Sequence, residues 1–379
     1  MWVACIVSWV VLLTAGLWPL NFNPQNGIEW ASDGRGIRFD GRGIVAGPAR
    51  DLSLKTVLPG PAPITIEFKV TPLSDSTGGL PQIITLFSPK TGEDFFVGQW
   101  RSFLIVRSRV GGLPAVGDYR EAGLRDVFHK GREVLVTITS DKESTSIFLN
   151  GALGRVVRHF SLCPASAVNS DILVLGTAPS GKEGWKGTLS GLAVYNRALS
   201  AEEVYQSADS WTKTGVPVVR GTDGPAALYI FGEGRGEIVH NSQRNGDDLR
   251  IPKSFRPLRR VFLEPNLKRI GTSRSFLSDV TLNILGFVFF ALFQGGLLLV
   301  ATSLRRHQVF FLTVLIGSGI SLFIELVQAY LPTRSSDLID LICNVLGSLL
   351  GAILLLRITK KAAPKSGPGM RTDPRGPSG

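Results

Sequence analysis

Four apolar stretches constrain the fold of this chain more than any other feature of its 379-residue sequence. They cover residues 2–20, 276–304, 309–331 and 338–356. Each has roughly 19 residues or more, and a helix needs about 20 to cross the hydrocarbon core of a bilayer. The mean hydropathy of +0.19 and the 44% share of hydrophobic residues agree with a partly embedded chain. We therefore predict four transmembrane helices.

Basic residues beside these stretches indicate the orientation of the chain. Arg305 and Arg306 follow the second stretch, and Arg357, Lys360 and Lys361 follow the fourth. Short loops rich in Lys and Arg stay in the cytoplasm, so both of these ends should face it. With four spans, the N-terminus is then cytoplasmic as well. The polar middle of the chain is expected on the opposite, extracytoplasmic side.

The net charge of +11 is concentrated in two places, residues 250–274 and the tail at 357–379. Such clusters beside apolar stretches favour anionic membrane lipid over nucleic acid as a partner. The first cluster includes a basic juxtamembrane linker at 263–275 and would lie outside, because long segments translocate largely regardless of charge. The tail is rich in Pro, Gly, Ser and Arg, and is predicted to be disordered and cytoplasmic.

The first apolar stretch could instead be a signal peptide that is cleaved after export. It has no basic segment before the apolar run, and the Ala-Gly-Leu at 15–17 is a poor cleavage site, so we favour a retained anchor. The cysteines do not decide the matter, because Cys5 and Cys343 lie in apolar stretches. Cys163 stands alone in the polar part, where no disulfide can form within it.

Residues 21–262 alternate short apolar runs with turns rich in Gly, Pro, Asp and Ser. The runs at 64–70 and 134–139 alternate inward and outward positions, as half-buried strands do. Another run ends in Asn150-Gly151, a pair that tolerates positive φ and closes β-hairpins. These patterns predict an all-β antiparallel sandwich.

Two segments of this region carry a more specific resemblance. Residues 132–151 (REVLVTITSDKESTSIFLNG) and 172–204 (ILVLGTAPSGKEGWKGTLSGLAVYNRALSAEEV) resemble the second half of a LamG-like, concanavalin A-like jelly roll. Residues 36–39 resemble its opening strand, and 227–242 a further strand and loop. The shared motifs belong to the scaffold, so the resemblance implies a jelly-roll fold and leaves the ligand open.

Hydrolysis of a glycan by this domain would need two carboxylates facing each other across a cleft, about 5 to 9 Å apart. Carbohydrate-cleaving relatives carry them on one strand as Glu-x-Asp-x-x-Glu, and this sequence has no such run. Glu233 and Glu237 flank a Gly-rich loop at the wrong spacing. The membrane part shows no nucleophile–base pair or metal set either. We therefore expect that the protein is not an enzyme.

The expected role of the sandwich is to bind a glycan or an envelope protein. Trp100 and Trp185 are candidate stacking surfaces for sugar rings, although a tryptophan in a sandwich is commonly part of the core. Calcium is the one cofactor considered, and its candidate ligands, which are equally consistent with solvated loop acids, are Asp40, Asp141 and Glu143. Three histidines lack metal-ligand spacing: His129, His159 and His240.

The apolar stretches also contain polar residues, which a bilayer interior disfavours. Three pairs of them are three or four residues apart, a spacing that puts both members of a pair on one helix face. In the predicted topology the pairs lie at similar depth, in the extracytoplasmic half of the membrane. Together with residues of the last loop they predict one outward-facing polar cluster, made of Asp279, Asn283, Glu325, Gln328, Arg334, Ser335, Asp337, Asp340 and Asn344.

The spacing of this cluster resembles that of the VanZ-like family of small bacterial membrane proteins. The shared pattern is Asp-x3-Asn-x2-Gly-Phe from residue 279, Ser-x3-Glu-x2-Gln from residue 321, and Leu-Pro-x-Arg-Ser-x-Asp-x2-Asp-x3-Asn-x2-Gly-x3-Gly from residue 331. The resemblance covers residues 276–356 together with 2–20, and it implies that the sandwich is inserted into the first external loop. Because the family is named for a role in teicoplanin resistance, it also implies a cell-envelope context.

Two readings of the cluster stay open. In one, ion pairs and interhelical hydrogen bonds merely hold the bundle together. In the other, the cluster is a shallow site in which Arg334 meets an anionic headgroup such as a lipid-linked phosphate. Asn283 stands where many relatives carry His, and an amide cannot titrate, so no proton relay is expected there. Gly347 and Gly351 are expected to allow close helix packing.

The combined expectation is a non-enzymatic, multi-pass protein of the bacterial inner membrane. Its sandwich would capture a glycan or an envelope protein outside the cytoplasm, and its four-helix bundle would engage a lipid-linked envelope precursor. The alternative is a transporter or flippase for a polyprenyl-linked or glycolipid substrate. Because three or four helices make a thin translocation path, this alternative would require a homo-oligomer.

Overall fold

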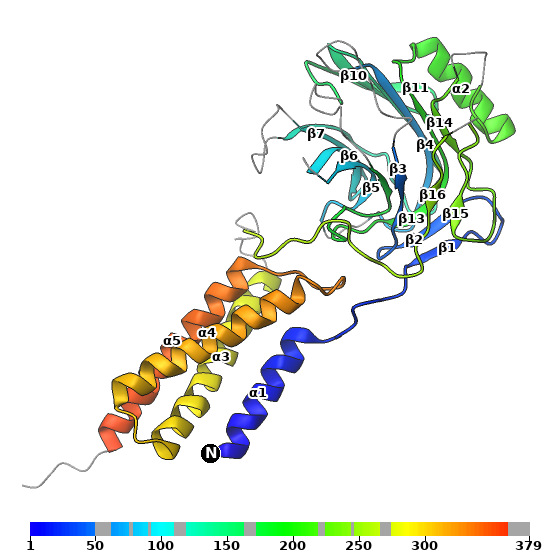
Figure 1. Cartoon of the computed structure of the whole chain (residues 1–379). Helices are drawn as coiled ribbons and strands as arrows, with labels where there is room; N and C mark the ends of the chain where they lie inside the picture. The colour runs from blue at the N-terminus through cyan, green and yellow to red at the C-terminus, as the bar shows by residue number, and fades with distance from the viewer. Residues whose placement is uncertain are drawn as a thin grey trace, which may run out of the picture. The chain divides into compact units, whose positions relative to one another are not determined.

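The computed structural model describes residues 1–49, 62–75, 79–89, 92–109, 119–162, 172–218, 224–243, 246–265 and 274–362, the last with backbone alone at 274, 275, 361 and 362 (Figure 1). The chain forms two compact units. One is Asn23–Arg260, and the other combines Met1–Phe22 with the chain from Val261 onward. Cys163 and most of the predicted basic linker and tail lie outside the described residues.

The first unit is a sandwich of two sheets whose neighbouring strands pair antiparallel, so the predicted β-sandwich is confirmed. The first sheet has the strand order β1-β2-β13-β4-β9-β10-β11, with β14 beside β13. The strands of this sheet are β1 (Ile28–Trp30), β2 (Ile37–Asp40), β4 (Ile64–Pro72), β9 (Val134–Ser140), β10 (Ser144–Leu149), β11 (Ala152–Arg158), β13 (Lys186–Tyr195) and β14 (Ala227–Tyr229).

The second sheet has the order β15-β16-β3-β12-β5-β6-β7-β8. Its strands are β3 (Val45–Pro48), β5 (Gln82–Ser88), β6 (Gly92–Trp100), β7 (Phe103–Arg109), β8 (Tyr119–Leu124), β12 (Ile172–Leu175), β15 (Ile238–Val239) and β16 (Leu249–Arg250). The predicted hairpin at Asn150-Gly151 joins β10 to β11, and both turn residues have positive φ, at 49° and 85°.

The core of the sandwich lies between the two sheets, and in some strands buried apolar side chains alternate with outward ones. In β2, for example, Ile37 and Phe39 are buried while Arg38 and Asp40 are exposed. The strand β9 is buried at every residue instead, because a helix covers the outer face of the first sheet. This double burial hides polar side chains that a simple strand pattern would leave in solvent.

The covering helix is α2 (Ala201–Thr214), which begins at a capping box formed by Ser200 and Glu203 and ends at Gly215 in the left-handed region, with φ 76°. It packs Val204 and Trp211 against the first sheet. The helix therefore closes a second, smaller core on the far side of that sheet (Figure 1).

The second unit contains the helices α1 (Trp2–Leu17), α3 (Arg274–Ala301), α4 (Arg306–Gln328) and α5 (Leu338–Ala362). In the described part of the chain, three helices are long and apolar enough to cross a membrane, at 276–301, 306–328 and 338–360. The helix α1 has only 16 residues, or about 24 Å of rise. It ends before Trp18, which is extended because the following proline disfavours the helical conformation. Length and composition thus support three spans where four were predicted.

Candidate functional site

The predicted polar cluster is centred on the carboxylate of Glu325, which is 1% exposed on α4. The backbone N–H of Asp337 donates a hydrogen bond of 2.7 Å to Glu325 Oε2. The hydroxyl of Ser336 hydrogen-bonds to the same carboxylate. An acid buried among apolar helices is thus satisfied by the loop between α4 and α5.

The same loop holds the segment that precedes α3 in the sequence. Leu263 N–H donates to Ser336 Oγ at 3.0 Å, and Glu264 N–H donates to the Ser336 carbonyl at 3.2 Å. Leu338 N–H in turn donates to the Glu264 carbonyl at 3.3 Å, which completes a parallel β-bridge between Glu264 and Asp337. Ser336 therefore joins this segment to the buried carboxylate.

Ser336 is a residue that the sequence reasoning missed, since it selected the neighbouring Ser335. Ser336 is 1% exposed, whereas Ser335 is only partly buried. Helical spacing cannot separate two adjacent serines in a loop. The available signal was that the loop is short and joins two helices that both carry buried polar groups.

Two further hydrogen bonds link helices inside the bundle. Asn283 Nδ2 on α3 donates to Asp340 Oδ1 on α5 at 2.8 Å. Asn344 Nδ2 on α5 donates to Ser321 Oγ on α4 at 3.0 Å. Such bonds between helices contribute about 0.6 kcal/mol each on average in a membrane.

Two aspartates at the edge of the cluster, Asp337 and Asp279, differ in their burial. Asp337 caps α5, because its Oδ1 accepts from Ile339 N–H at 2.9 Å. Asp279, one turn before Asn283, is exposed on α3 instead of buried with the others. The helix face predicted for this pair is therefore half-buried at its second member and exposed at its first.

Gln328 and Arg334 reach the end of α1. Gln328 Nε2 donates to the Gly16 carbonyl at 2.7 Å, and a terminal nitrogen of the Arg334 guanidinium donates to the Trp18 carbonyl. Among the described residues of the helical unit, the buried polar atoms without a hydrogen-bond partner include Gln328 Oε1, Arg334 Nε and Asn344 Oδ1. These atoms could bond to water or to a polar headgroup.

The two predicted packing glycines lie where α5 approaches α3. A Cβ at Gly347 would collide with the carbonyl oxygen of Ile284 and with Phe287. At Gly351 it would collide with the carbonyl oxygen of Val288 and with Ala291. Only glycine permits this distance between the two helices.

A further polar contact between helices, at Gln294, was not predicted from the sequence. Gln294 on α3 is 8% exposed, and its Oε1 accepts hydrogen bonds of 3.1 Å from Cys5 Sγ and from Trp9 Nε1 on α1. Trp9 also packs edge-on against Phe290, with 5.6 Å between ring centroids. A lone glutamine in an apolar run was the available signal, but the sequence does not indicate its partner.

In the sandwich, the prediction that Trp185 stacks on a sugar is wrong. Trp185 is 0% exposed, and its Nε1 donates to Gln99 Oε1 at 2.8 Å. It lies directly before β13 and belongs to the core between the sheets, where it packs against Phe39. Trp185 is a core residue.

Trp100, in contrast, is 44% exposed at the turn between β6 and β7. Its ring lies 5.3 Å from that of Phe103, and the guanidinium of Arg101 lies over it, 5.4 Å from the centroid. The turn is anchored by Gln99, whose Nε2 donates to the carbonyls of Ser74 and Arg101 at 2.7 and 2.8 Å. A rigid, partly exposed aromatic ring therefore lies at one end of the second sheet.

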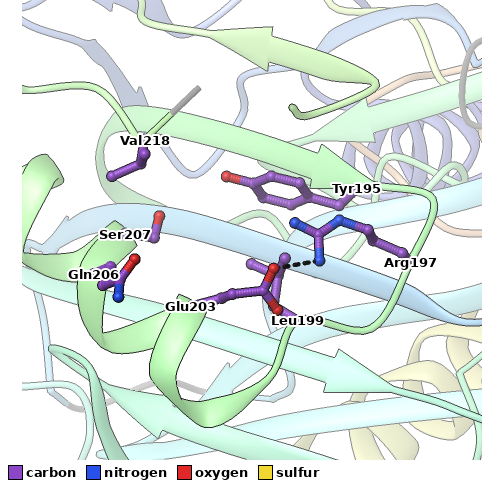
Figure 2. A pocket seen from close by; sticks show the side chains of 7 residues that line it. All are labelled: Tyr195, Arg197, Leu199, Glu203, Gln206, Ser207 and Val218. Atoms are coloured by element: carbon purple, nitrogen blue, oxygen red, sulfur yellow. Dashed lines mark hydrogen bonds and ion pairs between the residues drawn. The ribbon is translucent and has the colours of Figure 1, made fainter. Parts of the chain in front are cut away.

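A pocket of about 190 Å³ lies where α2 meets the first sheet, lined by Tyr195, Arg197, Leu199, Glu203, Gln206, Ser207 and Val218 (Figure 2). An ion pair of 2.7 Å joins Arg197 to Glu203 at its edge. Behind it lies Glu67 of β4, which is 0% exposed. Glu67 Oε2 accepts from Ser207 Oγ at 2.7 Å, from Trp211 Nε1 at 3.0 Å and from the Tyr195 hydroxyl at 3.2 Å.

Burial raises the pKa of Glu67 above its usual value, and the hydrogen bonds from Ser207, Trp211 and Tyr195 offset part of this effect. Burial likewise raises the pKa of Tyr195. Because the donors come from β13 and α2, the carboxylate fastens the helix to the sheet. The polar floor of the pocket is thus occupied by internal hydrogen bonds.

Another acid that the sequence reasoning missed is Glu93 of β6. Burial raises its pKa, while a hydrogen bond from Gln82 at 3.3 Å and the charges of Arg259 and Arg109 lower it. The Arg109 guanidinium also donates to the Glu93 carbonyl at 2.8 Å. Neither carboxylate stood out in the sequence, because Glu67 alternates with apolar residues and Glu93 stands beside Asp94 at the start of its strand, so that both are expected to face solvent.

The candidate calcium ligands serve local turns. Asp40 Oδ1 accepts from Arg42 N–H at 2.7 Å, and Asp141 Oδ1 accepts from the N–H groups of Glu143 and Ser144 at 2.8 and 2.7 Å. No group of three or more His, Cys, Asp or Glu side chains suited to a metal occurs among the residues that the structure describes. These contacts favour the reading of Asp40 and Asp141 as turn residues.

Comparison with known families agrees with both resemblances. Residues 52–205 match the concanavalin A-like lectin/glucanases superfamily, and residues 229–359 match the VanZ/LLP1 family. The second match begins at the last residue of β14, inside the sandwich. With its three apolar helices, the chain is a membrane protein that carries a lectin-like domain. No curated protein matches the chain significantly.

Solved structures resemble parts of the chain at low similarity. A heptameric SAP-like pentraxin from Limulus polyphemus is 12% identical, with a TM-score of 0.36 over 61% of this chain and 96% of that one. The CBM40 domain of the Ruminococcus gnavus IT-sialidase, bound to α2,3-sialyllactose, is 14% identical, with a TM-score of 0.31 over 38% and 82%. Botulinum neurotoxin type C, whose cell entry depends upon two ganglioside molecules, is 11% identical, with a TM-score of 0.37 over 49% and 45%.

Proposed function

Since the chain joins a concanavalin A-like lectin/glucanase domain to a VanZ-like membrane region, we propose that it is a glycan-binding protein of the bacterial cell envelope. In this proposal the protein is not an enzyme and resides in the inner membrane. The sandwich lies outside the cytoplasm and holds an envelope glycan. The helical bundle engages a lipid-linked envelope component.

The observation that carries the proposal is the placement of Trp100. An indole ring that is 44% exposed and fixed by its neighbours offers the apolar, flat surface on which the C–H face of a sugar ring stacks. Gln99 fastens the turn to the core through Trp185, so little side-chain and backbone freedom is lost on binding.

Binding of the full chain, reconstituted in nanodiscs of zwitterionic lipid, to immobilised polysaccharides tests this role. Trp100→Ala is expected to raise the Kd for the polysaccharide roughly tenfold, because one aromatic stacking partner is lost. Tyr205→Ala is the matched control, because Tyr205 is an exposed aromatic residue on α2 of the same unit. The proposal fails if wild type binds no glycan, or binds only an envelope protein through another surface.

The lipid-linked partner of the bundle is proposed from the buried polar atoms beside Arg334. A guanidinium suits a phosphate because it presents several N–H donors in one plane, and Arg334 Nε has no partner in the described chain. Gln328 Oε1 offers an acceptor for a hydroxyl in the same region. Native mass spectrometry of the purified protein is expected to show a bound phosphate-bearing lipid that Arg334→Gln loses and Arg306→Gln retains.

The proposal also includes α1 as a fourth, retained membrane helix with a cytoplasmic N-terminus. Three side chains form hydrogen bonds with α1 or with Trp18, the residue that follows it: those of Gln294, Gln328 and Arg334. Removal of α1 by cleavage would leave these groups against lipid, which is unfavourable. Labelling of a cysteine at position 334 from the extracytoplasmic side tests the orientation, and labelling from the cytosol alone contradicts it.

A second candidate function, a flippase or transporter for a polyprenyl-linked or glycolipid substrate, is favoured by one observation. Along α4 the buried face carries Thr313, Ser321, Glu325 and Gln328, and α5 opposes it with Asn344 and Ser348. A polar stripe through a bundle can line a path as well as hold helices together. Lipid scrambling in proteoliposomes that Glu325→Ala abolishes would support this function, and no scrambling in any lipid composition rejects it.

A further inference from the structure

Two arginines flank the aromatic pair at the end of the second sheet. Arg101 lies over Trp100, with 5.4 Å from its guanidinium carbon to the ring centroid, and Arg125 lies over Phe103 at 5.6 Å. Because the two rings are themselves 5.3 Å apart, the four side chains form one continuous row. We call Arg101, Trp100, Phe103 and Arg125 the aromatic–arginine strip.

The strip joins two segments that are distant in sequence and fixed against each other. The N–H groups of Val127 and Phe128 both donate to the Ser102 carbonyl, at 2.8 and 3.0 Å. These bonds tie the segment after β8, which carries Arg125, to the turn between β6 and β7, which carries Trp100. Gln99 also holds this turn through its hydrogen bond to the Arg101 carbonyl. The backbone that carries each arginine is therefore held by hydrogen bonds.

The strip is electropositive at its surface. Arg101 and Arg125 are both exposed. Asp126, which follows Arg125 in the sequence, carries a carboxylate that lies 3.1 Å from the ring of His129. A guanidinium stacked on an aromatic ring keeps its N–H donors in the plane of the stack, where they can reach a carboxylate or phosphate beside a sugar that lies on the ring.

We infer that the glycan bound at Trp100 is an acidic polysaccharide, whose sugar ring lies on the indole and whose anionic groups bond to Arg101 and Arg125. This inference rests on the proposed glycan-binding function and specifies its ligand class. An anionic bilayer is a poorer fit. On the described residues of β6 to β8, Trp100 and Tyr119 are the large apolar side chains that are exposed, and insertion into a bilayer relies on a larger apolar face.

The test uses the full chain in zwitterionic nanodiscs with two probes that share a backbone, polygalacturonate and its fully methyl-esterified form. Polygalacturonate is expected to bind at least roughly tenfold more tightly than the ester, with an affinity that falls as salt rises. The double variant Arg101→Gln/Arg125→Gln is expected to remove that difference. Arg35→Gln/Arg38→Gln, which removes two exposed arginines from the β1–β2 region, is expected to preserve it.

The outcomes separate the inference from the function on which it rests. If ester and acid bind equally and both depend on Trp100, the glycan-binding function stands and the acidic ligand class is rejected. If the Arg101/Arg125 variant keeps the full preference for the acid, the strip is not the site and the inference is rejected. If phosphatidylglycerol vesicles bind in a Trp100-dependent way while neither polymer does, both fail. Circular dichroism of each variant establishes that it is folded.

Discussion

The backbone nitrogen of Asp337 lies 2.7 Å from Oε2 of Glu325. The end of α4 is therefore hydrogen-bonded to the residue that directly precedes α5. Asp337 in turn caps α5 through its own carboxylate. Glu325 therefore acts on the start of the next helix through a single backbone donor. The polar residues that looked anomalous in an apolar stretch form the joint between the two helices, and this role does not exclude a bound headgroup beside them.

Replacing Ser336 by Ala should destabilise the helical unit. The hydroxyl serves Glu325 and Leu263 N–H together, and its loss leaves a half-buried donor and a buried acceptor short of a partner, at a cost of about 1–3 kcal/mol. Ser335→Ala is the matched control and should change stability by less than about 0.5 kcal/mol. Thermal unfolding of the full chain in detergent measures both. Equal shifts for the two variants would show that Ser336 is not the joint.

Replacing Gly347 by Ala should also destabilise the bundle. The new Cβ meets the backbone carbonyl of Ile284 and the Cβ of Phe287, so α5 and α3 must separate. Gly319→Ala on α4 is the control, because a Cβ there meets no atom within 4 Å and helix propensity favours Ala by about 1 kcal/mol. The expected result is a lower unfolding temperature for the first variant and an equal or higher one for the second. An unfolding temperature of Gly347→Ala that is equal to or higher than that of the parent would rule out close packing at Gly347.

Glu67 should make the sandwich less stable as the pH rises. The pKa of Glu67 is higher in the folded than in the unfolded chain. At a pH between these two pKa values, the folded chain therefore keeps a proton on Glu67 that the unfolded chain has lost. The stability that this proton contributes is lost as the pH rises through the pKa of the folded state. Glu67→Gln keeps an oxygen for the donors on Ser207, Trp211 and Tyr195 but cannot ionise.

The stability of Glu67→Gln relative to wild type is therefore expected to increase with pH above the usual glutamate range. Urea unfolding at a series of pH values, followed by tryptophan fluorescence, measures this difference. A difference between the two proteins that stays constant with pH would mean that Glu67 is not perturbed by its burial.

The sequence was a good guide to which residues share one face of a helix. It was a poorer guide to which helices, strands and loops contact one another. Helical spacing correctly placed Glu325 and Asn344 in the bundle interior, because 3.6 residues per turn is a local property. It could not select Ser336 over Ser335, since a loop has no period. Strand alternation likewise fails to mark Glu67 as buried, because the alternation places it outward and only α2 covers that outward face.

The two candidate tryptophans also show that a local sequence pattern does not determine whether a residue is buried. Both lie in or beside strands, and both are compatible with either a core or a surface position. Trp185 lies directly before β13 and is buried in the core between the sheets, while Trp100 ends β6 at an exposed turn. The order of strands in a sheet depends on long-range pairing, which the alternation of a single segment does not encode.

Gln294 provides the most direct test of whether α1 belongs to the bundle. Gln294→Leu removes the acceptor of the Cys5 and Trp9 hydrogen bonds and should loosen α1 from α3. In a variant whose other cysteines, Cys163 and Cys343, are replaced by Ser, maleimide labelling of Cys5 in membranes should then rise several-fold, because Cys5 is only 4% exposed when α1 is docked. Phe289→Leu, on the exposed face of the same helix, should leave the labelling unchanged. Two results would contradict this prediction: purified protein that lacks its first residues by intact mass, or a parent in which Cys5 labels as readily as in Gln294→Leu. In either case α1 is cleaved or undocked, and the contacts of Gln294 hold nothing in place.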